Sequence, residues 1–401
     1  MDHAEKIARI KSMLRQVAPH HDLEALHSTA LPDIELTEGF APLARRTSTV
    51  LAVDPVQAMD ALRKLKEGRD SDVSPSEGMG LEAIILPKIR PVAFVRGGTY
   101  DKMKAPWEWL DGGAIRARIN PLLGSIGRIE LPNMQDLPYA GTGFLVGRGL
   151  LITNRHVARF FADGVGRGAR LRYRPGDAGV DFKREAFAAA DNSSYFTVNE
   201  VVMIHPYWDM ALLRVDGLSP AYQPLTLATL DPQELVGRDV VVVGYPGRDH
   251  RNDAVVQDVV FEGVYNVKRL QPGQIGQRES VRSFDHEISA MLHDASTLAG
   301  NSGAAVIDIK KRSRDRSAFW RRIPESELCG ANVRAGARCA RGRYRAGLQR
   351  FGRVYKPLGR RLARSRRPGA AGARPAGDPY AAVCRTFCRT FGRTHYPRCG
   401  R

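Results

Sequence analysis

The sequence predicts a mainly β protein, an all-β barrel or sandwich, with a helical region before it and a basic tail after it. Three observations support this expectation. Between residues 125 and 309, short apolar runs alternate with turn residues, and no long helical pattern separates them. Before residue 120, apolar residues recur at helical spacing. After residue 309, arginine dominates and the apolar runs end.

The first 120 residues (1–120) are expected to form a helical accessory region. Two stretches with apolar periodicity are predicted as helices, and the second opens on Asp54 as N-cap with a proline at its first helical position. The expected elements are two helices, a linker, two short strands broken by prolines, and a third helix, at residues 2–17, 54–68, 68–80, 81–95 and 105–119.

Charge divides the 401 residues into two parts. The net charge of +18 comes from 61 Lys and Arg against 43 Asp and Glu. Residues 310–401 hold 26 of the basic and 4 of the acidic side chains, which leaves residues 1–309 with 35 basic and 39 acidic ones. All five cysteines also lie after residue 309. A mildly acidic body without cysteines needs no oxidising compartment, so we expect a cytoplasmic location.

The N-terminal stretch and the hydropathy agree with that expectation. The first residues, MDHAEKIARIKSML, are charged and amphipathic, and they lack the apolar segment and cleavage site of a secretory signal. No run of about 18 apolar residues occurs in the sequence, so no membrane span is expected.

Three stretches of the β-rich region carry polar residues at the edges of strand-like runs. They read GTGFLVGRGLLITNRHVARFF, HPYWDMALLRVDG and TLAGNSGAAVID, and they begin at residues 141, 205 and 297. His156 follows a strand-like run, Asp209 precedes an apolar strand, and Ser302 lies in a turn between two glycines. Taken singly, each such residue is more often structural than catalytic.

Taken together, the three residues are a much more specific signal of a catalytic site than any one of them alone. His156, Asp209 and Ser302 are separated by 53 and 93 positions, in the chain order of the chymotrypsin-type triad rather than that of subtilisins or α/β-hydrolases. The stretches TGFLVGRGLLITNRHV, DMALLRV and LAGNSGAAV resemble the bacterial trypsin-like serine peptidases of the chymotrypsin fold. The nearest branches are the glutamyl-endopeptidase-like and high-temperature-requirement-like ones. The resemblance implies a chymotrypsin-like double six-stranded β-barrel over a peptidase domain at residues 121–309.

The resemblance also implies a role for each of these residues. In a serine endopeptidase of this kind, Ser302 is the nucleophile, His156 is its general base, and Asp209 orients the imidazole and stabilises the imidazolium. The backbone N–H groups of Gly300 and Ser302 would form the oxyanion hole. In well-studied enzymes the loss of one such donor costs roughly 3–4 kcal/mol.

Specificity is expected to depend on the residues just before the serine loop. By the resemblance, Ser296 and Thr297 would line the base of the primary substrate pocket. Neither is acidic, which argues against cleavage after Arg or Lys because a buried cation needs a partner. A hydroxyl-lined base is similar to that of the glutamyl-endopeptidase branch. His293 precedes the loop and is interpreted as a structural side chain.

Residues 310–401 depart from the family pattern. The family continues with two more barrel strands, one carrying a His-aromatic-Gly-Gly stretch, and a helix. Here Leu, Ile, Val and Phe make up 12 of the 92 residues, which together with the positive charge predicts a disordered tail. Codons can be chosen for residues 311–340 so that reading from the second base gives NGQEIVAHFGGGYLNRNYAVPTFELARDA. We therefore expect a frameshift near residue 310, an incomplete second barrel and impaired activity.

Two other functions stay open at this point. The β domain could bind peptides without cleaving them, as a pseudo-protease, and the basic tail could bind nucleic acid non-specifically. Apart from these, the expected partner is a protein or peptide substrate, and no membrane partner, cofactor or metal is expected. The tail residues Cys384, Cys388, His395 and Cys399 are not interpreted as a zinc site, because they lack the β-turn context of a zinc finger.

Overall fold

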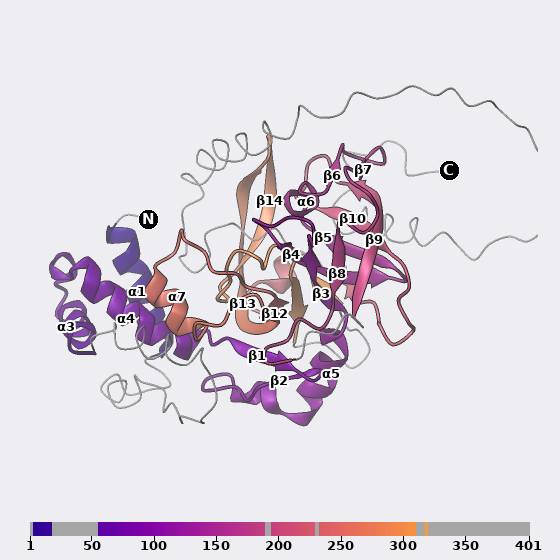
Figure 1. Cartoon of the computed structure of the whole chain (residues 1–401). Coiled ribbons are helices and arrows are strands. Elements are labelled where there is room, and N and C mark those ends of the chain that lie inside the picture. Colours follow the sequence, from indigo (N-terminus) through magenta and orange to yellow (C-terminus); the bar gives the residue numbers. More distant parts are fainter. Residues whose placement is uncertain (1–2, 18–54, 189–193, 229–231, 310–316, 320–401) are drawn as a thin grey trace, which may run out of the picture. The chain divides into compact units, whose positions relative to one another are not determined.

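A computed structural model describes residues 3–17, 55–188, 194–228, 232–309 and 317–319 (Figure 1). The chain divides into two units, Met1–Ala331 and Asn332–Arg401, and the second lies outside the described residues. The helices of the first unit are α1 (His3–Val17), α3 (Pro55–Lys66), η1 (Asp70–Asp72), α4 (Pro75–Ile89), η2 (Glu108–Asp111), α5 (Gly113–Leu123), α6 (Arg155–Ala158), η3 (Pro232–Leu235) and α7 (Ala254–Val260). Its strands are β1 (Ala93–Arg96), β2 (Thr99–Tyr100), β3 (Ile126–Glu130), β4 (Tyr139–Gly147), β5 (Leu150–Thr153), β6 (Ala162–Asp163), β7 (Arg170–Leu171), β8 (Gly179–Asp181), β9 (Tyr195–Ile204), β10 (Ala211–Val215), β11 (Thr226–Leu227), β12 (Asp239–Gly244), β13 (Arg269–Ser283), β14 (His286–His293), β15 (Ala305–Asp308) and β16 (Ser317–Phe319).

Six of these strands close into a barrel. Their order is β10-β5-β4-β3-β8-β9, and every neighbouring pair for which a register is given is antiparallel. The turn between β4 and β5 contains Gly149, whose positive φ of 69° suits glycine. Aliphatic and aromatic side chains such as Leu151, Val180 and Leu213 fill the interior and are fully buried. Because a closed barrel has no free edge, it is a firm support for the segments attached to it.

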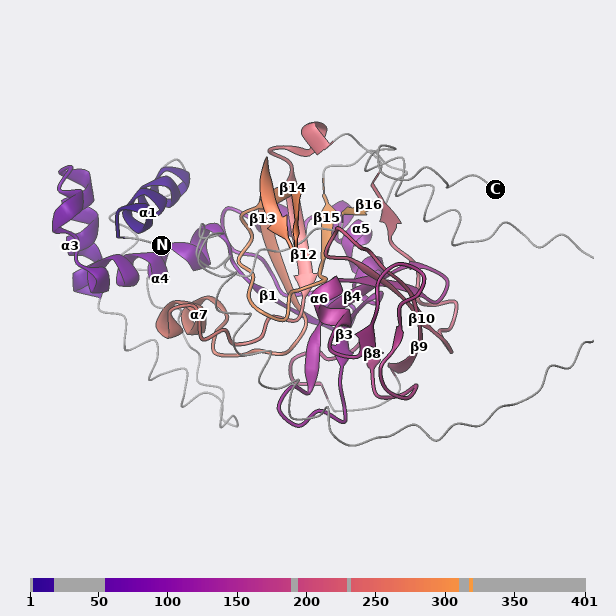
Figure 2. The ribbon, with the colours of Figure 1, turned by 90° about the horizontal axis from the view of Figure 1, so that it is seen from above.

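The second sheet has eight strands and stays open in the part of the chain that the structure describes. Its order is β11-β16-β15-β12-β13-β1-β2, with β14 paired to β13. Figure 2 shows the part of this sheet that contains β12, β13, β14, β15 and β16. One face buries a small core that includes Val240, Val242 and Val306. Strand β16 belongs to the predicted tail, and it pairs with β15; the remainder of residues 310–401 lies outside the described residues.

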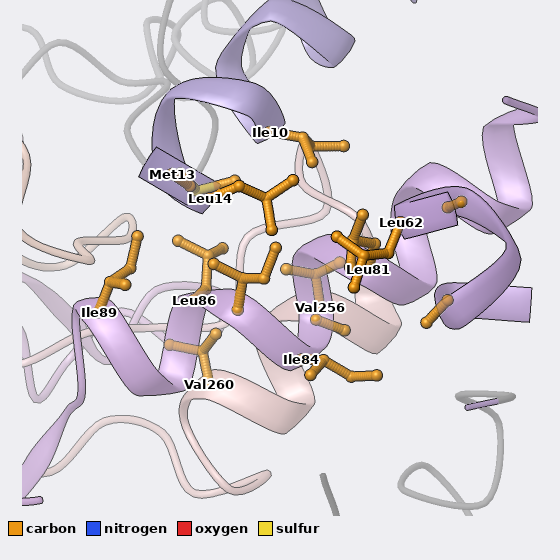
Figure 3. Packing of buried hydrophobic residues seen from close by; sticks show 14 of the residues in the cluster. Ile10, Met13, Leu14, Leu62, Leu81, Ile84, Leu86, Ile89, Val256 and Val260 are labelled. Carbon is orange, nitrogen blue, oxygen red and sulfur yellow. The ribbon is translucent and has the colours of Figure 1, made fainter. Parts of the chain in front are cut away.

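Helix α4 is the centre of a helical layer. Helices α1, α3 and α7 all contact it, and Figure 3 shows their apolar side chains meeting between the ribbons. The shared core contains Ile10 from α1, Leu62 from α3, Leu81 from α4 and Val256 from α7. Leu298, which precedes the loop of Ser302, belongs to the same cluster. The helical layer therefore touches the segment that leads to the predicted nucleophile.

Two local predictions are wrong. Residues 81–95 were expected as two strands after a linker, but α4 runs to Ile89 and only β1 follows. The hydroxyl of Ser74 accepts the amide of Glu77, and the Glu77 carboxylate accepts the amide of Ser74, which is a capping box at the helix start. A continuous apolar run is ambiguous between buried helix and strand, and packing on three helices decided it here.

The stretch that begins at residue 254 was also expected to be β-rich, and its first turns form α7 instead. The side chain of Asp253 caps this helix by accepting the amides of Val255 and Val256 at 2.9 and 3.2 Å. The valines favour strands by propensity, but burial against α4 stabilises the helix.

The predicted mainly β fold is confirmed, with N-terminal helices, a closed first barrel and a second sheet that does not close within the described residues. This architecture is consistent with a chymotrypsin-like double barrel. Residues 93–96 of the predicted accessory region join the second sheet as β1, which pairs with β13. No helix in the described ranges is long and apolar enough to span a bilayer.

Candidate active site

The first barrel positions His156 through the end of strand β5. The strand stops at Thr153, and the short helix α6 begins two residues later, so His156 lies in its first turn. Between them, the side-chain amide of Asn154 donates to the backbone carbonyl of Asp209 at 2.8 Å. Asn154 is fully buried, so this bond fixes the two segments against each other.

His156 and Asp209 form a doubly connected pair. The Nδ1 atom of His156 lies 2.6 Å from Oδ2 of Asp209, and the backbone amide of His156 donates to Oδ1 at 2.8 Å. Because an ionised carboxylate only accepts, Nδ1 carries the proton and Nε2 is left as the basic nitrogen. The Asp209 side chain is 1% exposed and that of His156 is 28% exposed, so the carboxylate is sealed while the imidazole reaches solvent.

A second histidine shapes the turn that leads to Asp209. Nδ1 of His205 accepts the amides of Tyr207 and Trp208 at 3.2 and 2.8 Å, and its ring stacks on the Trp208 indole at 4.9 Å. Burial, and then the charge of Arg155, lowers the pKa of His205 from 6.5 to about 4. The ring is therefore neutral at pH 7 and can accept both amides.

The tip of the β13–β14 hairpin reaches the helix of His156. The guanidinium carbon of Arg155 lies 3.8 Å from the centroid of the Phe284 ring. The same guanidinium donates to the carbonyl of Pro206 at 2.7 Å. Arg155 therefore joins α6, the turn before Asp209 and the hairpin of the second sheet.

The loop of Ser302 has a tight backbone conformation. Gly300 and Gly303 have positive φ angles of 86° and 87°. A Cβ atom on Gly300 would lie 2.4 Å from the carbonyl oxygen of Tyr245, and one on Gly303 would lie 2.1 Å from that of Thr142. Both positions therefore require glycine. Among the described residues, the amides of Gly300 and Ser302 donate to no other protein group.

Thr142 of β4 holds this loop against the first barrel. Its hydroxyl donates to the carbonyl of Gly300 at 2.7 Å and accepts the amide of Tyr245, and its own amide donates to the carbonyl of Ser302 at 2.8 Å. Its carbonyl accepts the hydroxyl of Thr153 at 2.7 Å, in the segment that leads to His156. One buried side chain and its backbone thus connect the serine loop with the histidine segment.

The same conclusion follows from the close packing around Gly141. A Cβ atom on this glycine would lie 2.8 Å from the carbonyl oxygen of Ser302 and 2.9 Å from a methyl group of Val157. Val157 directly follows His156, so the serine loop and the histidine helix meet at this point. The structure therefore brings all three predicted segments together, with a bonded pair between His156 and Asp209.

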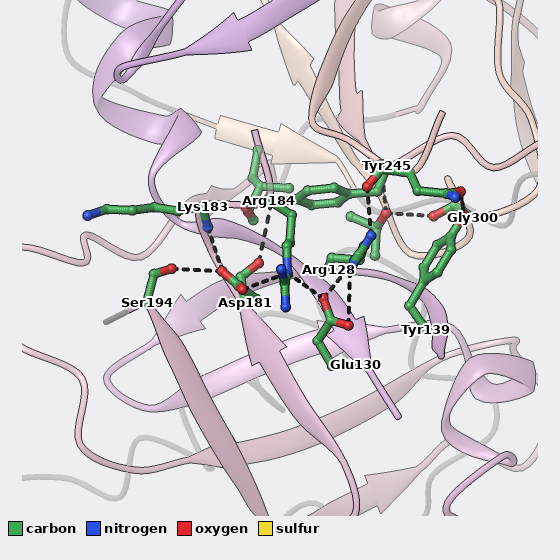
Figure 4. A network of polar contacts seen from close by, with 12 residues as sticks. Arg128, Glu130, Tyr139, Asp181, Lys183, Arg184, Ser194, Tyr245 and Gly300 are labelled. Carbon is green, nitrogen blue, oxygen red and sulfur yellow. Dashed lines mark hydrogen bonds and ion pairs between the residues drawn. The ribbon is translucent and has the colours of Figure 1, made fainter. Parts of the chain in front are cut away.

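A polar network lies behind Gly300 (Figure 4). The Tyr139 hydroxyl would be 2.9 Å from a Cβ atom on Gly300, and the guanidinium of Arg128 lies 4.8 Å from the Tyr139 ring centroid. Arg128 in turn donates to the carboxylate of Glu130 at 2.6 Å. Burial raises the pKa of Tyr139 to about 12, so its hydroxyl keeps its proton at neutral pH. The network stiffens the wall against which the loop turns.

The residues predicted to line the substrate pocket are enclosed. Ser296 and Thr297 are 2% and 1% exposed, and the Ser296 hydroxyl donates to the backbone carbonyl of Arg90 at 2.9 Å. Their role in a substrate pocket stays a prediction. His293 is buried at the end of β14, close to these residues in the chain.

Sequence reasoning missed three supporting residues, Thr142, Asn154 and His205. Each lies inside one of the three stretches that carry the predicted catalytic residues, so position in the motif was an available signal. Their bonds run between segments that are distant in the chain, and only the fold shows those bonds.

Comparison with known proteins finds several that are similar to this chain. A family model described as a trypsin-like peptidase domain matches residues 141–313. A probable serine protease of Lysobacter enzymogenes is 30% identical over 278 residues, which cover 62% of this chain and 71% of that protein. Two solved structures of the Rv3671c protease of M. tuberculosis are also similar to this chain, an inactive form at 20% sequence identity and the active form at 19%. These solved chains cover 58% and 66% of this chain, match over 100% and 95% of their own lengths, and have a TM-score of 0.33.

The Lysobacter enzymogenes protein is 30% identical to this chain and is matched over 71% of its length, which is enough to establish the family. Together with the match over residues 141–313, it shows that the chain belongs to the trypsin-like serine peptidases, which are hydrolases that act on proteins.

Proposed function

We propose that the chain is a serine endopeptidase that cleaves peptide bonds through Ser302, His156 and Asp209. The observation that carries this proposal is the 2.6 Å contact between His156 Nδ1 and the buried Asp209 carboxylate, beside a glycine-flanked serine loop. A hydroxyl is a weak nucleophile at neutral pH and needs a neighbouring base, which His156 supplies through Nε2.

In the first step, the Ser302 hydroxyl oxygen attacks the carbonyl carbon of the scissile bond while its proton moves to His156 Nε2. The resulting imidazolium is stabilised by the Asp209 carboxylate, which does not itself take up the proton. His156 then donates the proton to the leaving amine as the carbon–nitrogen bond breaks. An acyl-enzyme remains, and water activated by the same imidazole hydrolyses it and returns the proton to Ser302.

The negative charge that develops on the carbonyl oxygen needs donors that are in place beforehand. The amides of Gly300 and Ser302 suit this role because, within the described residues, they make no competing bond. The hydrogen bond from the Thr142 hydroxyl to the Gly300 carbonyl supports this orientation, because it fixes the plane of the peptide group between Gly300 and Asn301. Thr142 is therefore a positioning residue in this proposal.

A fluorophosphonate probe tests the proposal on the intact chain. We expect a single covalent adduct on Ser302, located by mass spectrometry of the digest. Substitution His156→Ala should reduce labelling by about three orders of magnitude, and Asp209→Asn should also reduce it strongly. His250→Ala, at an exposed histidine, is the matched control and should label like the parent. A folded parent without an adduct on Ser302 contradicts the proposal.

We also propose that the reading frame changes near residue 310 and that this chain has reduced activity. Its support is the open second sheet and a group of buried polar atoms that find no hydrogen-bond partner in the described part of the chain. They include the Gln271 amide, the Thr297 hydroxyl and the Asn301 amide. Buried polar atoms normally have hydrogen-bond partners, and the missing barrel strands expected from the family pattern would be a source of them.

Resequencing across codons 305–315 tests the frame directly. A second test expresses the chain with the frame shifted by one base after residue 310 and compares peptide hydrolysis. Faster hydrolysis by the shifted version supports the proposal, and an unambiguous single frame together with equal rates contradicts it.

Substrate class and location complete the proposal. We propose cleavage after residues other than Arg and Lys, because Ser296 and Thr297 are not acidic, and a panel of peptides that vary at this position would test it. A cytoplasmic location is proposed on the cysteine-free composition of residues 1–309, and cell fractionation would test it.

A further inference from the structure

The loop that carries Ser302 is not held by strand pairing. It lies between the end of β14 at His293 and the start of β15 at Ala305, so residues 294–304 make no ladder of backbone bonds. The oxyanion amides must nevertheless be placed to within about 0.5 Å for catalysis. The second sheet holds only the start of the loop, where the Asp294 amide donates to the carbonyl of Gln274 in β13 at 3.2 Å and Oδ1 of Asp294 accepts the Gln274 amide at 2.7 Å. The geometry of the remaining loop residues must therefore come from further contacts.

The second half of the loop makes the contacts with Thr142 and the first barrel already described, and the carbonyl of Ala299 accepts the amide of Gly247 at 2.6 Å. The first half, residues 294–298, is held in addition by a distant part of the chain. It contacts the segment that joins α4 to β1, more than 200 positions away in the sequence. That segment contains Arg90.

Arg90 meets the loop in two ways. Its Nε donates to Oδ1 of Asp294 at 2.9 Å and its Nη2 forms a second bond to Oδ2, which is a bidentate pair. Its backbone carbonyl accepts the hydroxyl of Ser296 at 2.9 Å. The Arg90 side chain is 7% exposed, so this pair is shielded from solvent on the arginine side.

Arg90 is itself rigidly placed. Its amide donates to the carbonyl of Leu86 at 2.8 Å and so closes the last turn of α4. Its guanidinium lies 5.6 Å from the Trp107 ring centroid and also donates to the carbonyl of Ile89. The indole of Trp107 donates to that same carbonyl at 2.8 Å. The guanidinium thus has a fixed position before it meets Asp294.

The helical layer adds an apolar contact two residues further along. Leu298 packs in the cluster of α1, α3, α4 and α7 and is 5% exposed. The carbonyl of Leu298 then accepts the amide of Asn301 at 3.1 Å, which closes the turn that contains Gly300 and leads directly to Ser302. A shift of residues 294–298 would therefore be passed on to the oxyanion amides.

We propose that Arg90 is a positioning residue for the serine loop, and that the N-terminal helical layer supports the active site through Arg90 and Leu298. This inference rests on the proposed function of Ser302. By this inference the N-terminal region supports catalysis by positioning the serine loop. The three motifs within residues 141–309 do not by themselves indicate this support.

The test compares Arg90→Ala, Arg90→Lys and Asp294→Asn in the full chain with Arg96→Ala as the matched control. Arg96 also forms a bidentate pair, with Asp101, but it is exposed and lies outside the serine loop. We expect Arg90→Ala to lower the rate of fluorophosphonate labelling of Ser302 by about tenfold or more, and Arg96→Ala to leave it unchanged. Arg90→Lys should recover part of the rate, because it keeps the charge but cannot form the fork.

Turnover of a peptide ester separates positioning from a general loss of structure. The Arg90 variants should lose kcat with little change in KM, because the oxyanion amides act on the transition state. Asp294→Asn removes the same fork from a half-exposed side chain and should show the same split if Arg90→Ala folds poorly. Labelling and kcat within twofold of the parent in both Arg90→Ala and Asp294→Asn would overturn the inference.

Hydrogen exchange distinguishes failure of this inference from failure of the proposed function. If the parent is not labelled on Ser302, the proposed function fails. The positioning role of Arg90 is then tested by the hydrogen-exchange rates of the backbone amides of residues 295–302. Exchange about tenfold faster in Arg90→Ala than in Arg96→Ala supports the role, and equal exchange overturns it.

Discussion

Acidification is expected to destabilise the protein through His205. This ring is 9% exposed and accepts two backbone amides through Nδ1, which only the unprotonated nitrogen can do. Its pKa is lowered from 6.5 to about 4, first by burial and then by Arg155. Between these two values the unfolded chain binds a proton that the folded chain does not, so stability falls as the pH drops through this window.

The magnitude follows from the size of the shift. Each pKa unit corresponds to about 1.4 kcal/mol, so the full shift is worth about 3 kcal/mol. Between pH 7.5 and 5.0 the loss amounts to about 2 kcal/mol. Carboxylates contribute little in this range, because their ordinary pKa values lie below 5.

Urea unfolding at a series of pH values measures the effect, with tryptophan fluorescence as the signal. The variant His205→Asn keeps an acceptor oxygen but has no group that titrates in this range. Between pH 7.5 and 5.0 its free energy of unfolding should therefore fall by about 2 kcal/mol less than that of the parent. Parallel pH profiles for the parent and His205→Asn would refute the reasoning. A His205 pKa near 6.5 by NMR titration would refute it as well.

Three further substitutions test other parts of the structure. Gly303→Ala should lower the free energy of unfolding by more than about 2 kcal/mol and abolish labelling of Ser302, because the new methyl would lie 2.1 Å from the Thr142 carbonyl at a positive φ. Phe284→Ala should cost about 1–2 kcal/mol by removing the ring that lies 3.8 Å from Arg155, and should speed proteolysis of the hairpin tip. Leu81→Ala should lower the free energy of unfolding by roughly 2–5 kcal/mol, measured in urea, because it leaves a cavity in the helical core.

Each of these substitutions has a control in the same chain. Gly68→Ala also places alanine at a positive φ, but nothing lies within 4 Å, so only about 1 kcal/mol of backbone strain is expected. Tyr173→Ala removes an exposed ring beside Arg172 and should change the free energy of unfolding by less than about 1 kcal/mol. Val56→Ala, at a 64% exposed side chain, should be nearly neutral. Losses equal to those of the buried sites would contradict the packing argument.

The sequence alone predicted those features whose signals are local. Strand alternation, the glycines around Ser302 and the strand-edge positions of His156 and Asp209 are all written in neighbouring residues. The order of the three motifs then indicated the family, and the two barrels followed from the family. Predictions failed at 81–89, where an apolar run suits helix and strand equally well, and at 254–260, where the valines favour a strand but packing against α4 stabilises a helix.

What only the tertiary structure decided is how distant segments hold one another. Neither the fork between Arg90 and Asp294, 204 positions apart, nor the fit of Gly303 against the Thr142 carbonyl has a signature in the local sequence. Hydrogen bonds and close contacts depend on position in space to within a fraction of an ångström, and chain neighbours do not determine that position. Amino-acid order therefore determined which chemical groups are present, and folding determined which of them meet.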